Sequence, residues 1–475
     1  MQKITSKLFQ PIDGAAIAVF RIGFGLILFL DIIRYGWKFS PVYSYLEPDI
    51  LFKYYGFGWV QPWGGDGLIW HHVVLAICAA GICLGLFYRF CIVVFTLGFT
   101  YLFLLDQAQY LNHFYMVILF CCLLCVIPAH RTWSLDALRK PTIASSIQPL
   151  WCKVLLVGQL EIILLYAGFV KLNADWLNLE PLRMWLARSA DLPLLGEYFV
   201  QDWSIAVGAY GVIALHLIGA PLLFVKKVRW IVLVIYASFH ILNHFVFYIG
   251  IFPWMTLFAS LLFFDADWPR QFYRSCQRLK GKLLSKDIPL YAWEPAGQTE
   301  NVQPPFSPYR RSIAVFVILW LVLQSVIPLR NFLYPGNVAW NEEGHRFSWR
   351  MKLRDKAGKA MFMITDRESK REWFISGSEY LSPRQLRKIP CQPEMILQFA
   401  HFLEKVWMEE KGYRDIQIYA AAQCSLNGRR LQPFVNSGVD LTEQTRTLGH
   451  RDWVVPLNEP LAQYFLPKEW FWQEH

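Results

Sequence analysis

QLEIILLYAGFVKLNADW, residues 159–176, decides how this chain is interpreted, because it begins as a membrane helix and ends in polar residues. Lys171 directly follows an apolar run, and Asn173 and Asp175 come just after it. A lysine held against apolar surface loses the hydration that its charged form needs, so its pKa falls and it can act as a neutral amine base. A lysine at a helix end can also extend its stem so that the ammonium reaches the lipid headgroups. Taken alone, this stretch leaves both interpretations open and favours the second.

The composition indicates a membrane protein. Of the 475 residues, 55% are hydrophobic and only 17% are charged, whereas soluble domains have about 25% charged residues. The net charge is 46 − 36 = +10, but the basic residues lie in short loops between apolar runs. Such loops reflect orientation in a membrane, so binding of nucleic acid is not predicted. The N-terminus has no evident cleavage site, and the first apolar segment is predicted as an uncleaved span.

We predict a polytopic α-helical membrane protein with about nine spans. The spans are expected at residues 14–33, 70–87, 90–105, 111–127, 152–171, 205–225, 230–247, 251–264 and 313–327. With the N-terminus in the cytoplasm, most loop Lys and Arg residues fall on the inner side. An odd number of spans then places the C-terminal part outside. The predicted domains are a multi-span membrane domain at 1–330 and an extracytoplasmic mixed α/β domain at 331–475.

The polar C-terminal part is predicted to fold as strands around one amphipathic helix. We expect strands at 347–354, 359–365, 372–375, 416–426 and 429–435, and a helix at 393–411. Asn427-Gly428 is a strong hairpin signal, and residues 355–358 are predicted to join the first two strands. Cys391 and Cys424 can pair if this part faces an oxidising compartment. The chain has no nucleotide-binding loop and no HExxH or GxSxG motif, so ATPase and hydrolase functions have no support.

The loop after the fifth predicted span has two interpretations. Pro181 can begin a short helix. Leu182, Trp185 and Leu186 would share one face of it. Such a helix would lie in the outer membrane interface, whereas the alternative is a plain solvated connection. The sequence favours neither.

Polar residues of three predicted spans fall at a similar depth near the outer face. They are Lys171 of the fifth span, Asn112 and His113 of the fourth, and His240, Asn243 and His244 of the seventh. This set suits proton abstraction and oxyanion stabilisation in a pocket open to lipid. His240 and His244 share a helical face, but no acid lies near them, so no metal site is predicted.

Other charged or polar residues inside the spans are expected to be structural. Arg21 and Glu161 lie at comparable depth toward the cytoplasmic side, and we predict that they form an ion pair. His216 in the sixth span is expected to pack or to form a hydrogen bond rather than to react.

Five stretches together follow a family pattern. They are AVFRIGFGLILFLD at 18–31, NHFYM at 112–116, GFVKLNADW at 168–176, FHILNHFVFYIGIFPW at 239–254 and DWVVPL at 452–457. With these residues the chain resembles the vitamin K-dependent γ-glutamyl carboxylase family of HTTM-domain membrane proteins. The stretches occur in the family's order over nearly the whole chain, and KLNADW together with the Asn-His pair is the most specific part.

The resemblance implies a reaction and its co-substrates. A lysine deprotonates reduced vitamin K, which is phylloquinol or menaquinol, and O2 converts the anion into a strongly basic alkoxide. That base removes a γ-proton from a peptide glutamate, and the carbanion adds CO2. The products are γ-carboxyglutamate and vitamin K 2,3-epoxide. The expected partners are therefore a Glu-containing protein or peptide, a quinone and membrane lipid.

The resemblance also implies roles for individual residues. Lys171 is the base, and His113 with Asn112 assists at the oxygenated quinone. The expected cofactor-binding residues are His240 and Asn243, which fall on a further polar site of the family, together with His244 and Tyr166. His244 rests on its predicted depth alone.

Departures from the animal enzymes indicate a bacterial homologue. Those enzymes continue well beyond the position of His475, and this sequence contains neither an N-x-S/T sequon nor an evident cysteine for the family's disulfide in the first outer loop. The expected location is a bacterial inner membrane, with the N-terminus in the cytoplasm and the C-terminal domain in the periplasm. Two alternatives stay open, namely a quinol epoxidase that does not carboxylate proteins and a non-enzymatic membrane scaffold or carrier.

Overall fold

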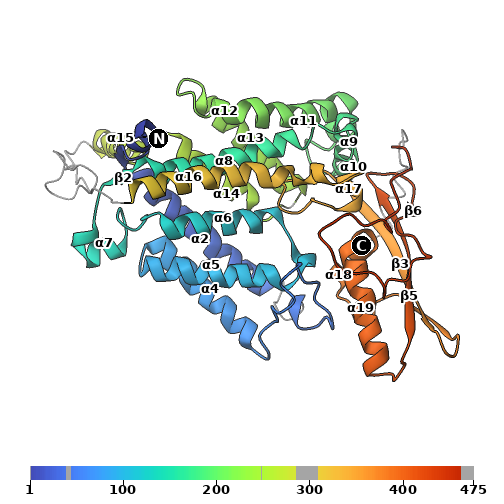
Figure 1. Ribbon diagram of the computed structural model, residues 1–475. Coiled ribbons are helices and arrows are strands. Elements are labelled where there is room, and N and C mark those ends of the chain that lie inside the picture. The colour runs from blue at the N-terminus through green and yellow to red at the C-terminus, as the bar shows by residue number, and fades with distance from the viewer. Residues whose placement is uncertain (1, 39–43, 248, 285–308, 462–475) are drawn as a thin grey trace.

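The computed structural model describes residues 2–38, 44–247, 249–284 and 309–461. Within these ranges, seven helices are long and apolar enough to cross a membrane, and two shorter apolar helices pack among them. The nine are α2 (Ala15–Lys38), α4 (Gly67–Leu84), α5 (Tyr88–Leu105), α6 (Asn112–Val126), α8 (Leu150–Phe169), α11 (Asp202–Ala214) with its continuation to Leu222, α13 (Arg229–Phe247), α14 (Phe252–Ser260) and α16 (Arg310–Val326). The predicted polytopic helical fold is confirmed. Figure 1 shows these helices side by side, with the sheet at one end of the bundle.

The outward face of the bundle is apolar, as a surface in contact with lipid requires. Along α13 the exposed side chains include Ile231, Val234, Ile235 and Phe245. Inside the bundle, Gly25 allows α2 to approach α4, because a Cβ at this position would lie 2.4 Å from the backbone nitrogen of Cys83.

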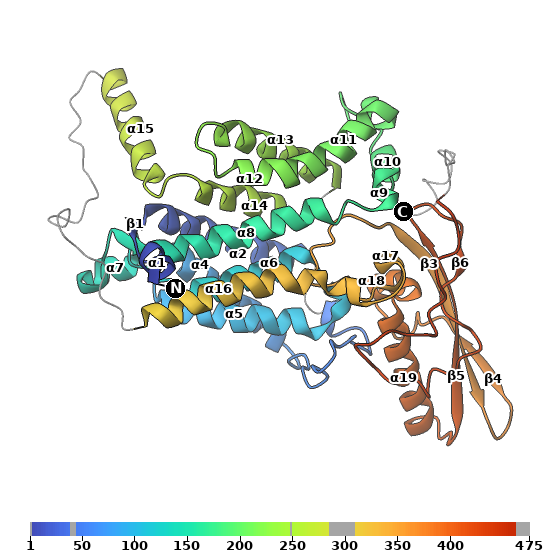
Figure 2. The same ribbon diagram turned by 45° about the horizontal axis from the view of Figure 1, so that its top comes forward.

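Basic elements lie at the end of the bundle opposite the sheet (Figure 2). They are α1 (Gln2–Leu8) and α15 (Trp268–Leu284). The short helix α7 (Leu135–Arg139), which has one acidic and one basic residue, lies at the same end. A short antiparallel pair, β1 (Pro11–Asp13) with β2 (Ile147–Pro149), joins the chain near α1 to the start of α8. This end therefore carries the basic residues that a cytoplasmic face favours.

The C-terminal part is a four-stranded antiparallel sheet in the order β4-β3-β5-β6, covered by one long helix. The elements are α17 (Val338–Asn341), β3 (Lys356–Asp366), β4 (Glu372–Ile375), α18 (Pro383–Lys388), α19 (Pro393–Glu409), β5 (Ile416–Leu426) and β6 (Gln432–Pro433). The apolar face of α19 packs on the sheet, where the rings of Phe399 and Phe362 are 4.9 Å apart. The predicted hairpin is present, with Asn427 and Gly428 both in the left-handed region at φ 52° and 78°.

Cys391 and Cys424 form a disulfide, with their Cα atoms 5.5 Å apart. Cys391 lies in the turn just before α19, and Cys424 lies on β5. The bond therefore ties the helix layer to the sheet. A disulfide here fits a domain that faces an oxidising compartment.

The predicted strand at 347–354 is wrong, and the hairpin predicted at 355–358 is therefore absent. Phe347, Trp349 and Lys352 have left-handed backbones with φ of 62°, 52° and 49°, which a strand cannot accommodate. Trp349 is fully buried and stacks on Tyr115 of α6 at 5.0 Å. Apolar residues that resemble a strand in sequence thus hold this segment against the bundle, and β3 begins only at Lys356. The strand predicted at 429–435 is likewise reduced to the two residues of β6.

The predicted ion pair between Arg21 and Glu161 is also wrong. Nη1 of Arg21 donates to the carbonyls of Ile82 and Cys83 at 3.0 and 3.1 Å, and Nη2 donates to the carbonyl of Trp133. Two of these carbonyls belong to the last turn of α4, where helix carbonyls lack partners within the helix. The guanidinium therefore adds to the capping contact that Gly85 makes with Ile82. Oε2 of Glu161 has no hydrogen-bond partner among the described residues.

The loop after α8 does form a short helix, α10 (Leu182–Ala187). Its apolar face, Leu182, Trp185 and Leu186, is buried against other protein segments. This helix is therefore part of the fold, rather than a helix that lays its apolar face in lipid.

Candidate active site

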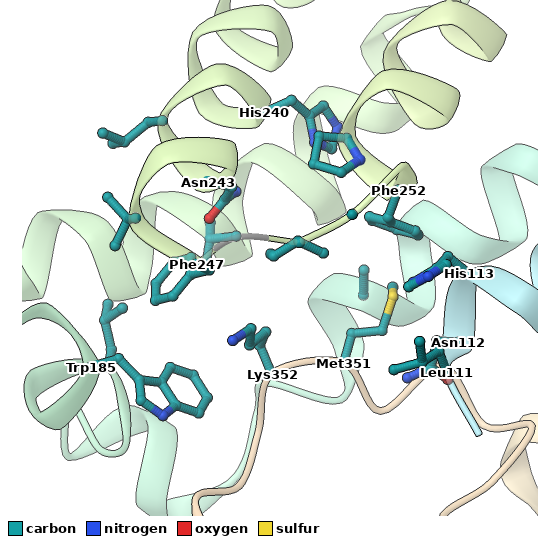
Figure 3. A pocket seen from close by; sticks show the side chains of 18 of the residues that line it. Leu111, Asn112, His113, Trp185, His240, Asn243, Phe247, Phe252, Met351 and Lys352 are labelled. Atoms are coloured by element: carbon teal, nitrogen blue, oxygen red, sulfur yellow. The ribbon is translucent and has the colours of Figure 1, made fainter. Parts of the chain in front are cut away.

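A cavity of about 920 Å³ lies where the helices meet the C-terminal part of the chain. Most of its lining is apolar and aromatic, with a few polar side chains converging on it, as is typical of small-molecule sites. Five of the seven predicted site residues line it, namely Asn112, His113, Lys171, His240 and Asn243. Figure 3 shows His240 and Asn243 facing His113 across this space.

Lys171 lies in the turn just beyond α8, two residues past the end of the spanning helix at Phe169. It is only 5% exposed, and its Nζ donates to the carbonyl of Ala167 at 2.8 Å. The Nζ also lies 5.0 Å from the ring centroid of Trp176. No carboxylate forms an ion pair with it among the described residues. Burial therefore lowers the pKa of Lys171 to about 7, so that much of the amine is neutral near physiological pH.

The polar residues after Lys171 hold the turn in place. Asn173 caps α9 (Ala174–Leu177) by accepting from the backbone nitrogen of Trp176 at 3.1 Å. Asp175 points away from the cavity and pairs with both terminal nitrogens of Arg429 at 2.6 and 2.7 Å. The KLNADW sequence thus places its lysine in the cavity and fixes its aspartate to the C-terminal hairpin.

Asn112 and His113 are the first two residues of α6. The hydroxyl of Tyr110 donates to Oδ1 of Asn112 at 3.0 Å and accepts from the backbone nitrogen of Phe347 at 2.8 Å. These contacts orient the amide, and the start of α6 supplies free backbone N–H groups.

His113 has a cationic neighbour that the sequence analysis did not identify. The side chains of His113 and Arg34 both approach Gly250. A Cβ atom on this glycine would lie 3.7 Å from Nε2 of His113 and 3.7 Å from Nη2 of Arg34, so the imidazole and the guanidinium line the same part of the cavity wall. Asp31 holds the guanidinium of Arg34 through a contact of 2.6 Å. Positive charge beside His113 suits an oxygen that gains negative charge.

His240 and Asn243 lie one turn apart on α13 and face the cavity (Figure 3). His240 is 3% exposed, and its Nε2 has no hydrogen-bond partner among the described residues. A buried ring nitrogen without a partner is costly, so a ligand hydroxyl or carbonyl would stabilise it. This orphaned atom and the apolar lining fit a quinol.

His244 and Tyr166 do not line the cavity, which counts against their predicted cofactor-binding role. The ring of His244 packs on Trp254 of α14 at 5.3 Å. The hydroxyl of Tyr166 donates to the carbonyl of Ser325 on α16. Sequence spacing placed His244 at the right depth but could not show which way its side chain turns.

Comparison with known families identifies two regions of the chain. Residues 9–268 match the HTTM domain, and residues 309–460 match the lumenal domain of vitamin K-dependent gamma-carboxylase. The chain belongs to the vitamin K-dependent gamma-carboxylase family. No solved structure matches it. For this gamma-carboxylase family member, both matched regions contribute to the cavity, since Lys171 lies in the first and Lys352 in the second.

The cavity also contains His216 and Lys352, which were not among the predicted site residues of this gamma-carboxylase family member. His216 is buried, as expected, and its Nδ1 contacts the carbonyl of Val212 at 2.7 Å. It sits in a π-helical turn (Leu215–Gly219), a feature that is frequent at functional sites. The sequence pattern did not identify Lys352 as a site residue, because its segment was predicted to be a strand.

Proposed function

We propose that this chain is an integral-membrane vitamin K-dependent γ-carboxylase. It would oxidise reduced vitamin K, or menaquinol, to the 2,3-epoxide with O2 and carboxylate peptide glutamate with CO2. The observation that carries the proposal is Lys171, a buried amine that has no carboxylate partner among the described residues, in a cavity shared by both matched domains.

Different side chains of the cavity have different roles in the first proton transfer. The neutral amine of Lys171 accepts a proton from a hydroxyl in the cavity, and the carbonyl of Ala167 orients the amine. Asn112 and His113, with the positive charge of Arg34 nearby, stabilise the oxyanion that this transfer leaves. His240 and Asn243 hold the opposite side of the ligand. Reduced vitamin K, once bound, supplies with O2 the strong base that no side chain provides.

The arrangement of the two parts supports the proposed location. We assign residues 1–330 to the membrane domain and 331–475 to the extracytoplasmic domain. The basic elements α1 and α15 lie at the bundle end opposite the sheet (Figure 2), which supports a cytoplasmic position for that end. The disulfide between Cys391 and Cys424 supports a periplasmic position for the other end.

One assay separates the proposed function from its alternatives. The purified protein in lipid nanodiscs receives reduced vitamin K, O2, labelled bicarbonate and a Glu-containing peptide, and epoxide and fixed label are followed together. We expect both products to form. Epoxide without label would leave a quinol epoxidase, and the absence of both products would leave the scaffold or carrier interpretation.

The activity is expected to depend on pH through Lys171. The amine works as a base only when neutral, so epoxide formation at low quinol concentration should fall as the pH drops below about 7 and level off above it. The measurement is the initial rate of epoxide formation from pH 5.5 to 9.5. A rate that keeps rising toward the ordinary lysine pKa of about 10.4 would show that Lys171 is not the titrating base.

A further inference from the structure

A second cavity, of about 390 Å³, has a size that fits a small ligand. Its walls are the turn at residues 131–134, the helix α7, the segment 141–146 and Arg270 of α15. The helices α7 and α15 lie at the bundle end opposite the sheet (Figure 2), and the second cavity shares no lining residue with the candidate active site. A ligand bound there would therefore be separate from the proposed reaction.

The lining of the second cavity is cationic. Its charged residues are Arg131 and Arg270, and no Asp or Glu is among the described residues that line it. Arg270 is paired through Nε with Asp13 at 2.7 Å. Nε of Arg131 donates to the carbonyl of Ile143 at 3.1 Å, but its two terminal nitrogens form no hydrogen bond or ion pair with any described residue. Arg131 therefore keeps its forked donors available for an anion, which such a guanidinium binds strongly.

The turn at residues 131–134 has unused N–H donors beside this charge. Nε1 of Trp133 is buried and has no hydrogen-bond partner within the part of the chain that the structure describes. The backbone N–H groups of Thr132 and Trp133 also have no partner there, and Trp133 has a left-handed backbone with φ of 48°. Free N–H groups beside a left-handed residue are typical of anion-binding turns. A buried donor without a partner is costly, so an anion in the cavity would stabilise it.

Contacts with the rest of the chain hold this turn in shape. Nη2 of Arg21 donates to the carbonyl of Trp133, and Oγ1 of Thr132 donates to the carbonyl of Ser145 at 2.6 Å. The guanidinium of Arg270 lies 5.3 Å from the ring centroid of Trp133. The donors are thus positioned before any ligand arrives, which lowers the cost of ordering them on binding.

Exposed apolar side chains beside the second cavity indicate an amphiphilic ligand. Leu138 of α7 lines the cavity and is 56% exposed, and Leu135, one turn earlier on the same helix, is also exposed. A soluble phosphate ester would leave these side chains in water, whereas the acyl chains of a lipid would cover them. Basic pockets at the cytoplasmic side of a helical bundle are typical binding sites for anionic lipid headgroups.

We propose that the second cavity binds the phosphate headgroup of an anionic phospholipid from the membrane leaflet at this end of the bundle. Arg131 and Nε1 of Trp133 donate to the phosphate oxygens, and Leu138 contacts an acyl chain. Soluble phosphate esters share the headgroup chemistry, and the exposed leucines of α7 favour the lipid. The inference does not depend on the proposed function, because the two sites have no residue in common.

Native mass spectrometry of the full chain in detergent tests this lipid site, because it resolves lipids that bind one at a time. Phosphatidylglycerol and phosphatidylcholine with identical acyl chains are titrated separately. In the wild type we expect the first phosphatidylglycerol to bind at least about ten-fold more tightly than the first phosphatidylcholine, as one charge-assisted contact implies.

Three variants locate the preference for phosphatidylglycerol in the cavity. The preference should fall to about one in Arg131→Gln. It should fall by about three-fold in Trp133→Phe, which keeps a ring but removes the N–H donor. The matched control is Arg278→Gln, which changes an exposed arginine of α15 outside the cavity and should leave the preference intact.

Equal binding of the two lipids by the wild type would overturn the proposal. An equal loss in Arg278→Gln and Arg131→Gln would also overturn it, because attraction to the basic surface would then need no cavity. If Arg131→Gln does not fold, Trp133→Phe decides, and an unchanged preference in that variant rejects the site. Displacement of phosphatidylglycerol by an equal concentration of glycerol 3-phosphate would assign the cavity to a soluble phosphate ester and reject the lipid.

Discussion

Replacing Lys171 by Ala is expected to lower the rate of epoxide formation from reduced vitamin K by about 10²–10⁴-fold, the usual contribution of a general base. Lys171→Arg should not restore the rate. A guanidinium stays protonated at any usable pH, so it cannot accept a proton, although it keeps the charge and the length. The measurement is the single-turnover rate of epoxide formation in nanodiscs at saturating quinol.

The matched control for this prediction is Lys153→Ala. Lys153 lies on the same helix as the base, near its other end, and its Nζ also donates to a backbone carbonyl, that of Phe264. It does not line the cavity. We therefore expect the Lys153 variant to keep its rate. A Lys171→Arg variant that turns over as fast as the wild type would contradict a base role and favour a structural lysine.

Replacing Arg429 by Ala is expected to destabilise the chain by about 3–5 kcal/mol, because it leaves a buried carboxylate without its partner. The side chains of Arg429 and Asp175 are 8% and 10% exposed, and Asn427 adds a third contact to Asp175 at 2.7 Å. This group attaches the segment that follows Lys171 to the C-terminal hairpin. We therefore expect epoxide formation to fall together with thermal stability in nanodiscs.

Two further variants test whether the unpaired carboxylate of Asp175 causes the predicted loss of stability. Arg430→Ala changes the neighbouring exposed arginine and should leave the unfolding temperature unchanged. The double variant Arg429→Ala with Asp175→Asn removes the unpaired buried charge and should recover part of the stability lost in the single variant. If Arg429→Ala unfolds at the wild-type temperature, the ion pair does not hold the two parts together.

The helices and much of the site were predictable from sequence, since both depend on local patterns. Long apolar runs specify spanning helices whatever their neighbours are. Lys171 and Asn112 stand at the ends of such runs and His240 lies in the outer half of one, so their depth followed from the topology. That these residues line one cavity could then be anticipated without knowing any side-chain direction.

What the sequence did not show depends on contacts between distant segments. Lys352 lies in a run that alternates like a strand, yet Trp349 of that run is buried against Tyr115 on α6. Arg21 was predicted to pair with an acid from its depth alone, whereas it donates to carbonyls at the end of α4. Local periodicity does not encode the contact of Trp349 or that of Arg21, because each depends on which distant segment packs against the residue.

Chemical rescue tests the central claim, that the amine of Lys171 is the base in this cavity, most directly. Small primary amines are added to the Lys171→Ala variant, and the rate of epoxide formation is measured against the pKa of the added amine. We predict that the rate is restored in proportion to the concentration of neutral amine and that it increases with the basicity of the amine. A Lys171→Ala variant that forms epoxide at the wild-type rate, or one that no amine restores although it still binds the quinol, would contradict the claim.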